Sequence, residues 1–258
     1  MIKALMAKEW RQLRWVWVIG GVLCLVTAVL TVAFYGTLGQ MIEEIPPEVL
    51  DVLLRYDAGQ QLLTLVASFD VYLWSQWNAK NMIQLGSLFV IIIATMQFAQ
   101  EAGKKTMGFY LTRPISRREG LAGKMLSGLM ALGAVFGAGT LALILLSRLF
   151  GYDVPAGRFL VAFLVGFCWM AVFYALAVRI SIGGLEPVLS AVITAAVGLG
   201  LSLPIFAGSW RVLSIFYQMR AGNYYLQGQN PLWSVSAALI LFSLLTLLNI
   251  RAFSRKDY

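Results

Sequence analysis

Six long apolar runs constrain what this chain can fold into. Each has close to the ~20 apolar residues that a helix needs to cross a bilayer, and they cover approximately residues 15–36, 82–100, 125–147, 159–179, 186–208 and 232–250. Of the 258 residues only 12% are charged, about half the share usual in a soluble domain. A soluble α/β domain would instead show short apolar segments alternating with charge. We therefore predict an all-α, polytopic integral membrane protein, in which residues 1–258 form a single transmembrane domain of six helices.

The distribution of basic residues predicts the orientation of these spans. An even number of spans places both termini on the same side of the membrane, and positive charge favours the cytoplasmic side. With both termini inside, the inner segments hold 14 Lys and Arg residues and the outer segments hold 6. We therefore predict cytoplasmic N- and C-termini. The net charge of +8 does not indicate a nucleic-acid partner, because the basic residues gather at the ends of the apolar runs and form no continuous stripe.

The segments outside the spans have distinct compositions. Residues 1–14 are basic and amphipathic, which is typical of a helix lying in the headgroup layer. Residues 37–80 form an acidic extracytoplasmic segment, in which the sequence EVLDVLLRY predicts a short surface helix. The aromatic residues just before the second span are expected at the membrane interface; they are Tyr72, Trp74 and Trp77. Residues 204–230 are either a re-entrant segment buried within the protein or a surface loop.

The longest strongly basic interruption runs from residue 101 to residue 124. Its apolar residues recur at helical spacing and predict a short helix that Pro114 ends near Arg113. Ser116 and Glu119 then form an S-x-x-E capping box. The third long helix is therefore predicted to begin at Ser116, outside the membrane, and to run for about 32 residues, or roughly 48 Å. Its glycines, including the pair Gly133 and Gly137, predict close packing against neighbouring helices.

Several kinds of chemistry have no residues to support them. The chain has no histidine, which excludes a Ser-His dyad and a histidine zinc site. Its two cysteines, Cys24 and Cys168, lie far apart in apolar runs and indicate neither a disulfide nor a metal site. The fragment AGKKT fails the phosphate-loop pattern, since Phe98 replaces its first glycine. We expect no catalytic residue, metal or cofactor in this chain, so energy for uphill transport would have to come from a partner.

The 101–124 stretch resembles the cytoplasmic connection of ABC transporter permeases of the type-2 exporter family, E-x-x-x-G-T-[LM]-x-x-L-L-S-x-P-[IV]-S-R followed by a lysine. The chain departs from this pattern at three positions: Lys105 stands where the family usually has glycine, Tyr110 replaces the first leucine of the pair, and Thr112 replaces the serine. The lysine that follows the pattern is Lys124. The C-terminal ending is similar to the family's F-x-R-[RK]-D pattern. The matching residues are Glu101, Thr106, Met107, Leu111, Pro114, Ile115, Ser116 and Arg117, and then Phe253, Arg255, Lys256 and Asp257.

The resemblance implies a permease subunit of a bacterial or archaeal plasma membrane. It would work as a dimer, with a second copy or a related permease, and would bind two cytoplasmic ABC ATPase subunits that hold ATP and Mg²⁺. Residues 101–118 would form the cytoplasmic coupling segment, whose apolar face inserts into the ATPase. This face and its polar rim comprise Glu101, Lys104, Lys105, Thr106, Met107, Tyr110, Leu111, Arg113, Pro114 and Arg117. The competing interpretation is a solvated basic loop that only fixes topology.

These observations leave more than one function open. The resemblance implies ATP-driven export of a hydrophobic or amphipathic molecule such as a lipid, peptide or drug. The alternative is a non-transporting scaffold or sensor that binds a partner through the acidic outer segment. An energy-independent channel is the third reading, although the sequence has no repeated filter motif. ATP-dependent movement of a substrate would distinguish the first reading from the other two.

Overall fold

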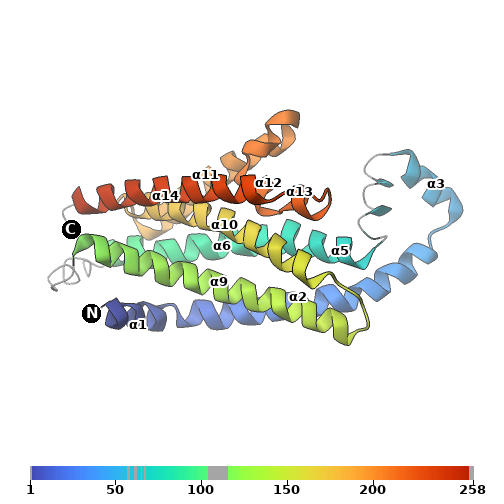
Figure 1. The fold of residues 1–258 in the computed structure, drawn as a ribbon, viewed down its shortest axis with the longest axis horizontal. Coiled ribbons are helices and arrows are strands. Elements are labelled where there is room, and N and C mark those ends of the chain that lie inside the picture. The colour runs from blue at the N-terminus through green and yellow to red at the C-terminus, as the bar shows by residue number, and fades with distance from the viewer. Residues whose placement is uncertain are drawn as a thin grey trace.

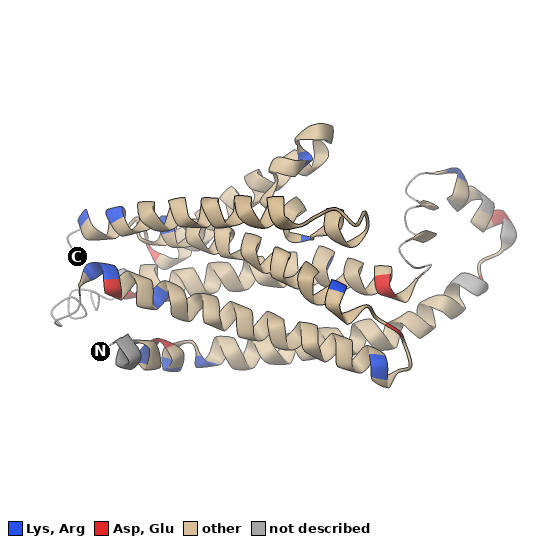
Figure 2. Cartoon of the chain, viewed as in Figure 1, with Lys and Arg blue, Asp and Glu red and all other residues tan. Residues whose placement is uncertain are grey.

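The structure is an all-helical bundle, as predicted. It is a computed structural model that describes residues 2–56, 59–60, 63–64, 66, 68–103 and 116–255, and within these ranges it contains helices and no strand. Six helices of the described part are long and apolar enough to cross a membrane. They lie side by side, and both termini lie at the same end of the bundle (Figure 1). Charged residues gather near the two ends of the bundle and leave its middle apolar (Figure 2).

The first, third, fourth, fifth and sixth of these helices are α2 (Arg14–Glu43), α9 (Arg117–Leu149), α10 (Ala156–Ser181), α11 (Pro187–Ser202) and α14 (Leu232–Arg255). The second is a continuous helical segment made of α5 (Phe69–Gln76), η1 (Trp77–Asn81), α6 (Met82–Ala94), η2 (Thr95–Ala99) and α7 (Gln100–Gly103). The shorter elements are α1 (Ile2–Gln12), α3 (Pro47–Arg55), η3 (Leu203–Phe206), η4 (Gly208–Leu213), α12 (Ile215–Met219) and α13 (Gly222–Tyr225).

The second helical segment begins at Phe69, well before the apolar run that starts at residue 82. The aromatic residues expected at the membrane interface are instead buried inside the bundle, and Trp77 is completely inaccessible. The indole of Trp77 donates a hydrogen bond to Thr140 Oγ1 at 2.9 Å, and that of Trp74 donates to the Arg220 carbonyl at 2.9 Å. An indole whose N–H finds a partner can be buried, so these side chains pack against neighbouring helices, and their depth relative to the membrane interface stays a prediction.

The start of α9 agrees with the prediction. Ser116 is its N-cap, and the reciprocal capping box with Glu119 is present. The helix continues for 33 residues to Leu149, which at 1.5 Å per residue is about 50 Å. Glycines bring it close to its neighbours: a Cβ added at Gly139 would lie 2.6 Å from the Trp77 ring, and one at Gly133 would lie 3.3 Å from the Phe167 ring.

The connection between α11 and α14 is neither a plain loop nor uniformly buried. Its first part, η3 and η4, is largely exposed, whereas α12 packs against α10. Met219 is fully buried and Tyr225 is 1% exposed. The burial within protein that a re-entrant segment needs is therefore present for α12 and α13.

Candidate functional site

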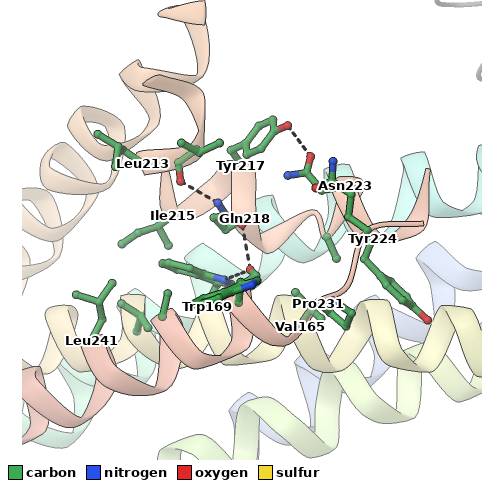
Figure 3. Close-up of a pocket in the computed structure, with 18 of the residues that line it drawn as sticks. Val165, Trp169, Leu213, Ile215, Tyr217, Gln218, Asn223, Tyr224, Pro231 and Leu241 are labelled. Carbon is green, nitrogen blue, oxygen red and sulfur yellow. Dashed lines mark hydrogen bonds between the residues drawn. The ribbon is translucent and has the colours of Figure 1, made fainter. Parts of the chain in front are cut away.

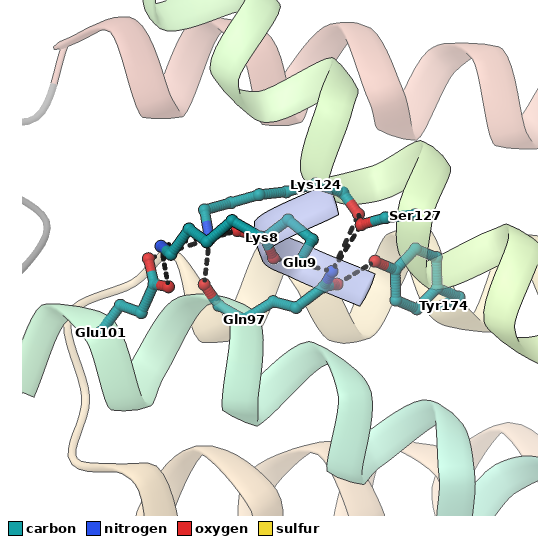
Figure 4. Close-up of polar contacts among 7 residues, drawn as sticks. All are labelled: Lys8, Glu9, Gln97, Glu101, Lys124, Ser127 and Tyr174. Atoms are coloured by element: carbon teal, nitrogen blue, oxygen red, sulfur yellow. Dashed lines mark hydrogen bonds and ion pairs between the residues drawn. The ribbon is translucent and has the colours of Figure 1, made fainter. Parts of the chain in front are cut away.

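A cluster of mostly buried polar side chains lies where the C-terminal half of α1, the first turns of α9 and the end of the second helical segment meet (Figure 4). Four parts of the chain that are distant in sequence contribute to it: α1, the η2–α7 turn, the first turns of α9, and α10. We call this group the polar cluster. Its members are Lys8, Glu9, Gln97, Glu101, Lys124, Ser127 and Tyr174.

Ion pairs form the centre of the polar cluster. Lys124 Nζ lies 2.8 Å from Glu9 Oε1 and 2.8 Å from Glu101 Oε2. Lys8 Nζ lies 3.0 Å from Glu101 Oε1. The side chains of Lys124 and Glu9 are completely buried, and that of Glu101 is 8% exposed. Two ammonium groups therefore balance two carboxylates, which is the condition under which charges can be buried.

The environment of Glu101 determines its charge state. Burial by itself would raise the pKa of this carboxyl group. The positive charge of Lys124 and hydrogen bonds from Lys124 and Lys8 outweigh that effect and hold the pKa of Glu101 below its ordinary value. Glu101 is therefore ionised at neutral pH, as the ion pairs require.

Gln97 hydrogen-bonds to the ion-paired residues and connects them to one further helix, α10. Its Nε2 donates to Glu9 Oε2 at 3.3 Å and to the Lys124 carbonyl at 3.0 Å, and Tyr174 donates its hydroxyl proton to Gln97 Oε1 at 2.7 Å. Gly128 makes room for this arrangement, because an added Cβ would lie 2.8 Å from Gln97 Oε1 and would overlap the Tyr174 hydroxyl. Gln97 lies in the π-helical turn η2, a local distortion that is frequent at functional sites.

The polar cluster also joins α1 to the bundle. The Leu13 N–H bonds to the Glu9 carbonyl at 2.9 Å, so α1 runs almost directly into α2. α1 packs along α9, and Glu9 and Leu13 face the interior with no exposed surface. The predicted location of this helix in the headgroup layer stays a prediction, but one of its faces is fixed to α9 by the Glu9–Lys124 pair.

The predicted coupling residues fall into two groups. Glu101 lies at the end of the second helical segment with its carboxylate in the polar cluster, and Arg117 opens α9, where its Nη1 donates to the Ser254 carbonyl at 3.1 Å. The two residues therefore flank the coupling segment. The remaining predicted residues lie outside the described residues; they are Lys104, Lys105, Thr106, Met107, Tyr110, Leu111, Arg113 and Pro114.

The sequence analysis did not identify Glu9, Gln97, Ser127 or Tyr174 as site residues. Two of them, Glu9 and Gln97, stand out in the sequence and could have been identified. Glu9 is the sole acidic residue among the first 42, in an otherwise basic helix, and Gln97 interrupts the apolar run of the second span. Both are polar residues that must find partners once their helices are buried.

The polar cluster joins helices that are distant in the sequence. Its members contact one another, and Lys124 and Glu101 link the helix that precedes the coupling segment to the helix that follows it. Within the described ranges, no group of three or more His, Cys, Asp or Glu residues is placed to hold a metal ion. The geometry can therefore keep the two flanks of the coupling segment and α1 together as one unit.

The chain was also compared with known protein families, curated proteins and solved structures. The sequence profile of the family described as ABC-2 family transporter protein matches residues 3–232. The matched region includes α1, the polar cluster, the coupling segment and the first five long helices. No curated protein and no solved structure matches the chain. Because the family match covers most of its length, the chain is a multi-pass membrane protein that belongs to the ABC-2 transporter family.

Proposed function

We propose that the chain is the permease subunit of an ATP-driven exporter. It pairs with a second copy or a related permease in a bacterial or archaeal plasma membrane, and two cytoplasmic ATPase subunits that bind ATP and Mg²⁺ dock on residues 101–118. The observation that carries this proposal is the Glu101–Lys124 ion pair of 2.8 Å, which ties together the two helices on either side of that segment. Family membership supports the same assignment.

The polar cluster gives this docking a mechanical consequence. A movement of the coupling segment acts on α7 and α9 together, because Glu101 and Lys124 join them. It also reaches α1, since Lys124 holds Glu9 at 2.8 Å. α9 is a single helix of 33 residues and transmits the displacement across the bilayer. Closure of the ATPases would thus tilt several spans as one rigid body and switch access to the path between the subunits.

The apolar character of the spans supports a hydrophobic or amphipathic cargo. None of the apolar run positions 15–36, 82–100, 125–147 or 232–250 holds an Asp or Glu, so proton relays of the usual carboxylate type have no residues there. Lipids, peptides and hydrophobic drugs are the cargo classes that such a surface accommodates.

The test is a double substitution on the predicted docking face. Met107→Asp combined with Leu111→Asp should release the ATPase during purification in mild detergent, because two carboxylates replace the apolar contact. ATP-dependent transport in sealed vesicles should be lost together with binding. The matched control is Leu149→Asp with Phe150→Asp, two exposed apolar residues at the opposite end of α9. If the coupling double variant binds the ATPase and transports like the control, the docking assignment is wrong.

A second candidate function rests on α3. This amphipathic helix exposes apolar side chains, including Val52 at 50% and Tyr56, just beyond its end, at 67%. Such a surface suits a scaffold or sensor that binds an extracytoplasmic partner through residues 37–80. The vesicle assay separates the two candidates: absence of substrate movement with the ATPase bound and active would favour the scaffold.

A further inference from the structure

A groove of about 700 Å³ lies between α10, α12 and α14, away from the polar cluster (Figure 3). Among the described residues that line it, none carries a formal charge. Its wall on α14 descends from Ser234 through Ala237 and Leu241 to Leu245, and its wall on α10 from Val165 to Leu176. On α14 it runs from the beginning of the helix to about its middle, whereas on α10 it runs from near the middle of the helix toward its C-terminal end.

The depth of the groove matches one leaflet. Ser234 and Leu245, like Val165 and Leu176, are eleven helical positions apart, or about 16 Å at 1.5 Å per residue. One leaflet contributes about half of the ~30 Å hydrocarbon layer. The groove is therefore long enough to hold a hydrocarbon chain that extends for about the thickness of one leaflet.

The polar groups inside the groove already have partners. Trp169 Nε1 donates to Ser234 Oγ at 2.8 Å, and Ser234 Oγ donates to Gln218 Oε1 at 3.0 Å. Gln218 Nε2 in turn donates to the Val212 carbonyl at 2.8 Å. A bound molecule would therefore meet apolar side chains and polar groups that are already hydrogen-bonded to one another. Such a lining favours an apolar chain over a polar ligand.

Two arginine side chains lie next to the groove without lining it. The guanidinium groups of Arg211 and Arg220 lie over the ring of the groove residue Tyr217, at 5.4 and 4.6 Å from its centroid. Arg220 Nε is buried and has no hydrogen-bond partner among the described residues. The chain from residue 187 to residue 256, which includes both arginines, contains no Asp or Glu. Two guanidinium groups close together can bind the negatively charged oxygens of a phosphate group.

We propose that this groove is a binding site for a membrane phospholipid. One acyl chain lies along Trp169, Leu241 and Leu245, and the phosphate is held by Arg211 and Arg220. The inference goes beyond the proposed function and does not depend on an ATPase partner.

The experiment is photolabelling of the full-length protein, purified in mild detergent, with phosphatidylglycerol that carries a diazirine in its acyl chain. Labelled positions should fall on α10 near Trp169 and on α14 from Ala237 to Leu245. Ala237→Trp fills the groove and should reduce this labelling to background. Ile240→Trp is the matched control, because Ile240 lies on the same helix, is 61% exposed and does not line the groove, and it should label like the wild type.

A second variant tests the headgroup site. Arg211→Gln with Arg220→Gln should weaken labelling by phosphatidylglycerol, and millimolar inorganic phosphate should not compete with the lipid in the wild type. If Ala237→Trp fails to fold, the positions labelled in the wild-type protein still test the proposed site. Labelling spread evenly over the outward leucines of α14, retention of a compound other than phospholipid in the groove, or cross-links there to a second copy of the chain would each overturn it.

Discussion

Lys124 is the residue on which the proposed mechanism most depends. A completely buried ammonium group is costly unless carboxylates and hydrogen bonds surround it. Lys124 meets this condition with Glu9, with Glu101 and with the Gln97 carbonyl, to which it donates at 3.2 Å. The sequence motif places a lysine at this position, but the structure shows that it faces inward and that one of its partners comes from α1.

We expect Lys124→Met to destabilise the protein strongly. The substitution removes the cation 2.8 Å from the buried Glu9 carboxylate and leaves it only the half-exposed Lys8 ammonium at 3.7 Å, and breaking a buried pair in this way costs about 3–5 kcal/mol. Thermal or denaturant unfolding in a fixed detergent measures the loss of unfolding free energy. Adding Glu9→Gln and Glu101→Gln to Lys124→Met should recover part of it, because no buried charge then remains unbalanced.

The control for this measurement is Arg118→Met on the same helix. Arg118 is exposed, and surface substitutions of this kind stay within about 0.5 kcal/mol. A Lys124→Met protein as stable as the Arg118→Met protein would show that the ion pairs do not hold the helices together.

At the scale of elements, the contact between η2, α9 and α10 depends on the absence of one side chain. Gly128 faces Tyr174 and Gln97 so closely that a methyl group has no space. Tyr174 is itself fully buried and cannot move to solvent. The sequence analysis identified the glycines of this helix as packing positions without saying which neighbour each one contacts.

Gly128→Ala should separate these helices and disrupt the hydrogen bond between Tyr174 and Gln97. Overpacking of this kind costs about 1–3 kcal/mol. Unfolding measurements should show the decrease, and near-ultraviolet circular dichroism should report a changed tyrosine environment. Gly137→Ala is the matched control on α9, since its added Cβ would lie 3.7 Å from the Phe163 ring, an ordinary contact. Equal stability of the two variants would refute the close approach at Gly128.

At the scale of the whole molecule, the two ends of the bundle carry different elements. The polar cluster, the flanks of the coupling segment and both termini share one end, whereas α12 and α13 lie toward the other (Figure 1). The excess of basic residues in the segments expected inside favours the cytoplasm for the end that carries the termini.

Single cysteines introduced after replacing Cys24 and Cys168 by serine should report this orientation. Asp153→Cys and Ser209→Cys are expected to react with a membrane-impermeant maleimide on intact cells. Arg118→Cys and Ser254→Cys should react only after permeabilisation. All four positions are exposed, so a missing reaction reflects the membrane rather than burial. If Arg118→Cys and Ser254→Cys react on intact cells, the predicted orientation is wrong, and residues 101–118 cannot be a cytoplasmic docking site.

The sequence by itself determined the features that depend on neighbouring residues. The six long helices follow from the apolar runs, because a spanning helix satisfies all of its backbone hydrogen bonds internally. The beginning of α9 follows from Ser116 and Glu119, which cap the helix locally.

Only the tertiary structure decided which polar residues meet. Glu9 and Lys124 are 115 positions apart, and no local pattern states that α1 will pack along α9 and bring them together. The same holds for Trp77, which is buried because Thr140 on another helix accepts its hydrogen bond. Local sequence fixes where helices form, whereas the free energy of satisfying a buried charge or dipole depends on groups that the folded bundle alone brings within reach.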